Sequence, residues 1–128
     1  MIKSPKLRFN DIGYIKHNGN VISLELYNAG TAVETIQVNH LVCVSKGCMT
    51  KSSFNKEYLS SCYPDDFIKN LLMRKPVFQK MGYRKTKNGF IQEIQTKKVS
   101  IIYKVIKENL YFKDRKNKIL VKLKEINE

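Results

Sequence analysis

The chain between Gly89 and Ile126 alternates apolar and polar residues, and this pattern constrains the fold more than any other feature. The apolar positions that recur at every second residue are Val99, Ile101, Tyr103, Val105, Ile119, Val121 and Leu123. Polar turns such as Asn88-Gly89 and Glu108-Asn109 interrupt the alternation about every ten residues. A period of two broken by turns is typical of antiparallel strands joined by hairpins. The sequence therefore predicts a strand meander over residues 82–126.

A second set of strands is predicted over residues 7–44. His17-Asn18-Gly19 separates two alternating segments, and Asn-Gly is among the strongest short hairpin signals. Leu24 and Leu26 share one face of the second segment, as in a half-buried strand. Residues 1–10 are expected to be mostly an irregular lead-in, because an early proline opposes strand pairing there.

A helical segment is predicted between the two sets of strands, over residues 54–75. Phe54–Ser61 is expected to form a short helix with Ser53 or Asn55 as its cap. Pro64-Asp65-Asp66 predicts a second helix start, because proline suits the first turn and carboxylates stabilise the exposed amide dipoles. An apolar stripe at helical spacing follows: Phe67, Ile68, Leu71 and Leu72. This stripe is expected to pack on the apolar face of the sheet.

The order of strands, helices and strands predicts an α+β fold. A chain of 128 residues is long enough for one domain with a two-layer core, here residues 1–128. We expect a single curved antiparallel sheet, bent toward a half-barrel by the twist of its strands, with the helical insertion packed on one face.

The net charge of +13, from 24 basic and 11 acidic residues, indicates an anionic partner such as nucleic acid, a membrane surface or lipid phosphate. The alternative is a lysine-rich solvated surface, because arginine, which grips phosphates bidentately, is scarce. No apolar run approaches the roughly 18 residues that would span a bilayer. The N-terminus also lacks the apolar core of a signal peptide.

Three cysteines form the first candidate site: Cys43, Cys48 and Cys62. The Cys43-x4-Cys48 spacing is unusual for zinc, and only His17 and His40 could complete such a site, so no metal or cofactor is predicted. We expect instead a Cys43–Cys48 disulfide that pins a strand end to the loop before the helix. Such a bond requires an oxidising compartment. The alternative is three reduced, mostly buried thiols.

No catalytic residues are predicted, and the chain is not expected to be an enzyme. A nucleophilic pair of His40 and Cys43 would need side chains that point to opposite faces of an extended segment. Asp65-Asp66 is explained by its place at a helix start. The glycines are scattered singly at turns, so no glycine-rich phosphate loop is present.

Nucleic-acid binding through the lysine-rich C-terminal sheet is the alternative function. A stacking platform would combine aromatic residues with lysines: Phe90, Tyr103, Tyr111 and Phe112 with Lys97, Lys98, Lys104 and Lys113. The alternation opposes this, because Tyr103 shares its face with Ile101 and not with Lys104. The aromatic residues would then belong to the core and the lysines to the outer face.

The closing meander contains Gly89-Phe90-Ile91-Gln92, Val99-Ser100-Ile101-Ile102-Tyr103 and Ile119-Leu120-Val121-Lys122-Leu123. With the preceding strands and helical insertion, it resembles the LolA/LolB-like group of bacterial periplasmic carriers and outer-membrane lipoproteins. It is also similar to small lipoproteins of Campylobacter and Helicobacter relatives, which share its Lys/Asn-rich style. The chain is shorter than typical LolA/LolB members, and its loop after Tyr27 lacks the protruding leucine of lipoprotein-inserting members. The resemblance implies an unclosed barrel whose apolar concavity accepts acyl chains, tethered by an N-terminal lipid outside this sequence.

We therefore expect a non-enzymatic, monomeric envelope protein that binds a lipid or lipoprotein acyl chain between its sheet and helix. The side chains expected to line that concavity are Leu24, Leu26, Phe67, Leu71, Ile101, Tyr103 and Phe112. Apolar walls suit acyl chains, because burial contributes roughly 25 cal/mol per Å² without directional groups. The alternative at this length is that the same residues pack as a closed core. The expected location is the periplasm, anchored to the outer membrane, with the cytoplasm as the alternative.

Overall fold

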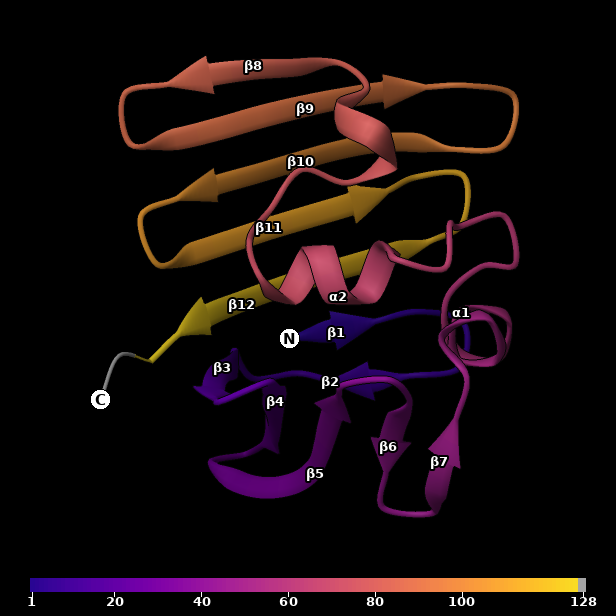
Figure 1. Ribbon diagram of the computed structural model, residues 1–128, viewed down its shortest axis with the longest axis vertical. Helices are drawn as coiled ribbons and strands as arrows, with labels where there is room; N and C mark the ends of the chain where they lie inside the picture. The colour runs from indigo at the N-terminus through magenta and orange to yellow at the C-terminus, as the bar shows by residue number, and fades with distance from the viewer. Residues whose placement is uncertain (127–128) are drawn as a thin grey trace.

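A computed structural model describes residues 1–126 and has an α+β architecture (Figure 1). Over that range, 12 strands form one unclosed, mixed sheet. The strands are β1 (Ile2–Lys3), β2 (Arg8–Phe9), β3 (Gly13–Asn18), β4 (Val21–Asn28), β5 (Thr31–Val38), β6 (Val42–Val44), β7 (Gly47–Met49), β8 (Tyr83–Thr86), β9 (Gly89–Gln95), β10 (Ser100–Ile106), β11 (Asn109–Asp114) and β12 (Ile119–Glu125). The helices are α1 (Lys51–Tyr58), α2 (Phe67–Leu72) and the 3-10 helix η1 (Phe78–Lys80). The predicted curved sheet with a helical insertion is confirmed.

The two predicted sets of strands meet at β12. The order across the sheet is β7-β6-β5-β4-β3-β12-β11-β10-β9-β8, with β1 beside β12 and β2 beside β1. Leu123–Glu125 of β12 lies parallel to Gly13–Ile15 of β3, whereas the other pairings are antiparallel. The expectation of a purely antiparallel sheet is therefore wrong at this junction. A parallel neighbour requires a long connection, and residues 19–118 provide one.

The N-terminal segment is more ordered than the sequence pattern indicates. Ile2 and Lys3 form β1, and Ile2 is buried and paired with Val121 of β12. The expectation of an irregular lead-in is wrong here, because Pro5 falls in the connection between β1 and β2. Because Pro5 lies outside both strands, its lack of an N–H group removes no backbone hydrogen bond between them. The Leu7 N–H donates instead to the Ser4 hydroxyl at 3.1 Å and tightens this connection.

Helix α1 begins at Lys51 and not at Phe54, because Thr50 supplies the cap. The Thr50 hydroxyl accepts a hydrogen bond from the Ser53 N–H at 3.1 Å. Ser53 and Asn55, the predicted caps, lie inside the helix. Asn55 is buried, and its side chain donates to the Pro64 carbonyl at 2.9 Å. Just before α1, the expected loop contains the short strand β7.

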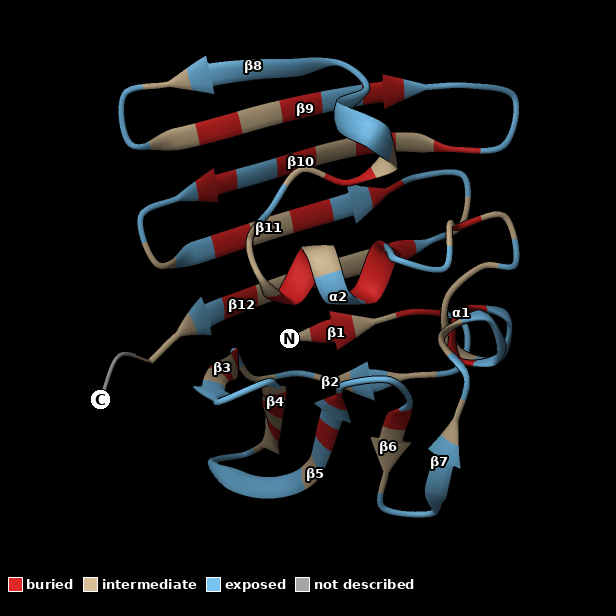
Figure 2. Cartoon of the chain, viewed as in Figure 1, coloured by how far each residue is buried: buried red, intermediate tan, exposed pale blue. Residues whose placement is uncertain are grey.

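Helix α2 begins at Phe67, three residues after the predicted start at Pro64, so Pro64-Asp65-Asp66 precedes the helix and no carboxylate lies in its first turn. The helix lies over β12 (Figure 1). All four residues of its apolar stripe are buried, which confirms the predicted packing: Phe67, Ile68, Leu71 and Leu72. The Phe67 ring lies 5.1 Å from the ring of Phe112 in β11, measured between centroids. Figure 2 shows buried residues alternating with intermediate or exposed ones along β9 to β12. One face of the sheet therefore forms the core with the helices, and the other faces solvent.

The Leu71→Asp substitution is expected to unfold the protein or nearly so. Leu71 is 1% exposed in the stripe of α2, so the new carboxylate would be buried without a partner. We expect a loss of at least about 3 kcal/mol, a large part of the roughly 5–15 kcal/mol that stabilises a small domain. Urea unfolding followed by circular dichroism measures it. Lys69→Asp, at an exposed position of the same helix, is the control and should cost no more than about 1 kcal/mol.

Candidate functional site

The seven side chains predicted to line an acyl-chain concavity all lie in the core. Their exposed fractions do not exceed 2%: Leu24, Leu26, Phe67, Leu71, Ile101, Tyr103 and Phe112. They come from β4, α2, β10 and β11. Their own side chains fill the space between α2 and the sheet, as in the alternative of a closed core. They therefore contribute to the core that holds the fold together.

An apolar pocket of about 200 Å³ lies instead between α1 and the N-terminal half of the sheet. We call it the α1 pocket. Its walls are mainly apolar, with charged residues among them: Leu7, Phe9, Ile36, Val44, Phe54 and Tyr58, with Lys6, Glu34 and Lys46. Phe54 and Ile36 are each 1% exposed and belong to the core, whereas Val44 is half-buried. The pocket is therefore an opening that reaches the edge of the core between sheet and helix.

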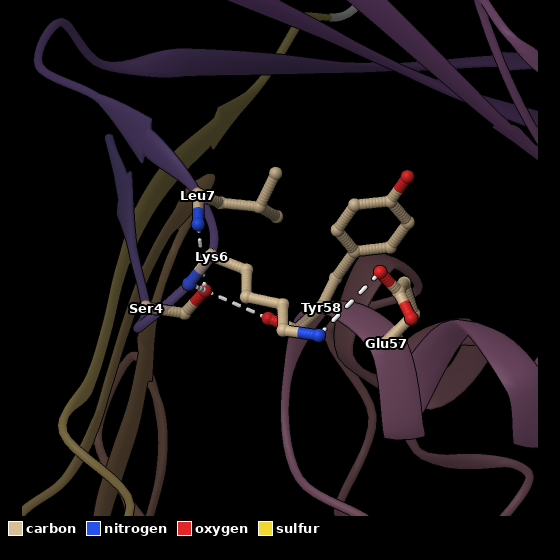
Figure 3. Close-up of polar contacts among 5 residues, drawn as sticks. All are labelled: Ser4, Lys6, Leu7, Glu57 and Tyr58. Carbon is tan, nitrogen blue, oxygen red and sulfur yellow. Dashed lines mark hydrogen bonds and ion pairs between the residues drawn. The ribbon is translucent and has the colours of Figure 1, made fainter.

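A small set of polar contacts holds the N-terminal wall of the α1 pocket (Figure 3). The buried Ser4 hydroxyl donates to the Tyr58 carbonyl at 2.7 Å and accepts from the Leu7 N–H at 3.1 Å. These bonds join the β1–β2 connection to the C-terminal end of α1. Leu7 and the Tyr58 ring lie on the same side of these contacts, and both line the pocket (Figure 3).

The rim of the α1 pocket carries two lysines, Lys6 and Lys46, and the carboxylate of Glu34. The Glu34 carboxylate accepts hydrogen bonds from the Ser45 N–H at 3.0 Å and the Ser45 hydroxyl at 2.9 Å. Lys46 has no ion-pair partner within residues 1–126. Lys6 lies 3.5 Å from Glu57, but both side chains are more than half exposed, so the pair contributes little. An anionic group at the pocket mouth would therefore meet the Lys46 ammonium directly and would compete with Glu57 for that of Lys6.

The predicted disulfide between Cys43 and Cys48 is confirmed. The two residues lie directly opposite each other in the β6–β7 hairpin, so the bond joins two strands. Val44, the next residue after Cys43, lines the α1 pocket, and the disulfide therefore constrains one of its walls. Cys62 is free and partly buried. Because Cys43 is oxidised, it cannot form a nucleophilic pair with His40.

A buried polar cluster lies at the turn between β11 and β12. The Tyr63 hydroxyl donates to Asp114 at 2.5 Å. The same carboxylate accepts from the backbone N–H groups of Ser100, Lys116 and Asn117 at 3.1 to 3.3 Å. These bonds close the turn and attach the segment before α2 to the sheet. The cluster is structural, since each donor to Asp114 is either a backbone group or a side chain that tethers a loop.

A charged cluster joins β3, β12 and the end of α2. Glu125 binds Arg74 and lies 2.5 Å from the His17 imidazole, and Arg74 also donates to the Lys107 carbonyl. In the part of the chain described, no hydroxyl or thiol hydrogen-bonds to His17. The cluster therefore contains no activated nucleophile. Over the same residues, no group of three His, Cys, Asp or Glu side chains is placed to hold a metal ion.

The chain matches no protein-family model, no curated protein and no solved structure. The resemblance to LolA/LolB-like proteins therefore stays a prediction. Among the helices within residues 1–126, none has the length and apolar character needed to cross a membrane.

Protein exported to the bacterial periplasm should carry one alkylatable thiol. Without reductant, denatured protein is expected to gain a single label, at Cys62, because Cys43 and Cys48 are bonded to each other. After reduction it should gain three. Peptide mass spectrometry locates the labels, and Cys62→Ala, which should take none before reduction, is the control. Labelling of Cys43 and Cys48 before reduction would contradict this pairing in the exported protein.

Two of the seven tyrosines should resist ionisation in the folded protein. Burial raises the pKa of Tyr63, whose hydrogen bond to Asp114 raises it further, and burial also raises the pKa of Tyr103. In the unfolded protein the same phenols ionise at a pKa of about 10. The contribution of these two neutral phenols to the free energy of unfolding is therefore fully present below that pH and is lost as pH rises above it. Ultraviolet titration should show two phenols that ionise only with unfolding.

Each of the variants Tyr63→Phe and Tyr103→Phe should remove one of these late phenols. Complete tyrosine ionisation while the circular dichroism spectrum remains that of the folded protein would contradict the assignment.

Proposed function

We propose that this chain is a non-enzymatic lipid-binding protein whose α1 pocket takes the end of an acyl chain. The observation that supports this proposal is an apolar pocket at the edge of the core with two lysines at its rim, Lys6 and Lys46. An acyl chain needs apolar walls without directional groups, and an anionic head group needs cations at the mouth. The ligand class is thus an amphiphile with an anionic head, such as a fatty acid or a phospholipid.

The size of the pocket limits how much of the ligand it encloses. Its volume of about 200 Å³ is below the roughly 300–1,000 Å³ of pockets that enclose whole drug-sized ligands. A segment of about four methylenes would gain roughly 3 kcal/mol on burial, at ~0.8 kcal/mol each. With head-group contacts added, we expect a dissociation constant between about micromolar and millimolar. Binding of this strength permits release as well as capture.

The proposed location is the bacterial envelope, with the protein in the periplasm and anchored to the outer membrane. The disulfide supports an oxidising compartment, because such bonds are rare in the cytosol of mesophiles. The resemblance to LolA/LolB-like proteins points to the same compartment. A natural protein isolated with Cys43 and Cys48 reduced would favour the cytoplasm instead.

Filling the α1 pocket should abolish acyl-chain binding without unfolding the protein. Val44→Phe adds a ring to the half-buried wall of the pocket. Titration with a fluorescent fatty acid below its micelle concentration should then show affinity at least about tenfold weaker, equivalent to roughly 1.4 kcal/mol. Val33→Phe adds the same volume at a position 47% exposed outside the pocket lining, and should bind like the wild type. Circular dichroism checks that both variants fold.

Substitution of the two lysines at the rim provides a second test of the same site. Lys6→Gln with Lys46→Gln should weaken binding of the anionic fatty acid and leave binding of a neutral alcohol of equal chain length unchanged. Failure of the wild type to bind either probe would reject the proposal. Equal losses for Val44→Phe and Val33→Phe would place the ligand elsewhere.

A further inference from the structure

The solvent face of the C-terminal sheet carries a cluster of lysines, which we call the basic face. Its members come from β1, β10, β11 and β12: Lys3, Lys104, Lys113, Lys122 and Lys124. Register places them on one side, because directly paired residues of neighbouring strands share a face. Lys104 pairs with Tyr111, and Tyr111 pairs with Lys122. In the next row, Lys113 pairs with Leu120, and Leu120 pairs with Lys3.

These five lysines are not neutralised by the protein itself. None of them takes part in an ion pair within residues 1–126. On the neighbouring strand, Glu93 faces the same side, opposite Ile102. The charge of the face is therefore strongly positive, and its partner should be anionic.

Exposed aliphatic side chains lie among the lysines. Ile12 and Ile106 are each 48% exposed. They border a shallow depression of about 220 Å³, which Tyr111, Lys104 and Lys122 also line. An apolar patch between cations is the pattern of a surface that lies in the interfacial region of a bilayer, with its lysines at the phosphates.

We propose that the basic face docks the protein on the surface of an anionic phospholipid bilayer. Single-stranded nucleic acid fits the face less well, because stacking requires accessible aromatic rings. Phe90, Tyr103 and Phe112 are buried in the core. Tyr111 and, opposite Lys124, Tyr14 do lie on the face, but both are half-buried. The Lys122 ammonium is 5.8 Å from the centroid of the Tyr111 ring, and the Tyr14 ring packs edge-on against that of Tyr27 at 5.7 Å. The exposed apolar groups at the depression are aliphatic, which suits lipid and not bases.

Docking through this face is independent of acyl-chain binding in the α1 pocket. The residues of the basic face and the lining of the α1 pocket do not overlap. The pocket is tested with a soluble fatty acid, and the face is tested with intact vesicles. Failure of one proposal therefore leaves the other standing.

The experiment is co-sedimentation with vesicles, at low and high salt. Wild-type protein should bind vesicles of phosphatidylcholine and phosphatidylglycerol in equal parts, and not phosphatidylcholine alone. Lys104→Gln with Lys122→Gln should weaken binding about 25-fold, at about fivefold for each lysine near an anionic surface. Ile12→Ser with Ile106→Ser should also weaken it several-fold. Lys56→Gln with Lys69→Gln, which removes two exposed charges from the helices, is the matched control and should change binding less than twofold.

Three outcomes would overturn the proposal. The first is absence of binding to the mixed vesicles by the wild type. The second is an equal loss for the two pairs of lysine variants, which would mean that net charge alone acts. The third is vesicle binding unchanged by the isoleucine pair. Single-stranded DNA is tested in parallel: if DNA binds and vesicles do not, the face is a nucleic-acid site. If both bind, the isoleucine variant decides. The bilayer is supported when Ile12→Ser with Ile106→Ser weakens vesicle binding and leaves DNA binding unchanged.

Discussion

The edge that β12 shares with β1 and β3 holds the two halves of the sheet together. The first half of β12 pairs with β1 and its end pairs with β3, while residues 119–124 pair with β11 on the other edge. Gly13 packs closely at the parallel junction. A Cβ atom there would lie 2.8 Å from a terminal methyl group of Leu123 and 3.0 Å from one of Leu26, so these leucine side chains would have to shift. The last strand of the chain thus determines where the first strands lie.

Both proposed surfaces depend on this arrangement. Pairing of β1 with β12 places Lys3 on the basic face and, through β2, brings Leu7 and Phe9 to the α1 pocket. The Ser4 hydroxyl then attaches the same segment to the end of α1. A short N-terminal segment therefore contributes to a pocket on the core side of the sheet and to the charged face on its solvent side. Alternation of side chains along a strand makes this possible, since neighbouring residues point to opposite faces.

Features that rest on local pattern could be predicted from the sequence, and features that rest on pairing between distant segments could not. The alternation in 82–126, the stripe on α2 and the Cys43–Cys48 bond are all set by residues close together in the chain. Strand β1 has two residues, too few to show an alternation of apolar and polar side chains. It is defined by its pairing with the distant strand β12. The α1 pocket combines side chains from the N-terminal segment, β5, β6 and α1, so no single stretch of sequence signals it. Tyr111 lies on the same face as Lys104 and not in the core. The local pattern does not show this, because Leu110 and Phe112 on either side are also apolar.

The packing of the core explains why the proposed acyl-chain site lies at its edge and not within it. Opening the space between α2 and the sheet would expose side chains such as Phe67, Leu71 and Phe112, each at most 1% exposed. Burial of one such side chain contributes roughly 1.5–3 kcal/mol, so exposing three would cost about as much as the roughly 5–15 kcal/mol that stabilises a whole domain. An acyl-chain end that gains about 3 kcal/mol cannot meet that cost. It can occupy a pocket that is already open, and a bilayer surface can bind a charged face without moving the core at all.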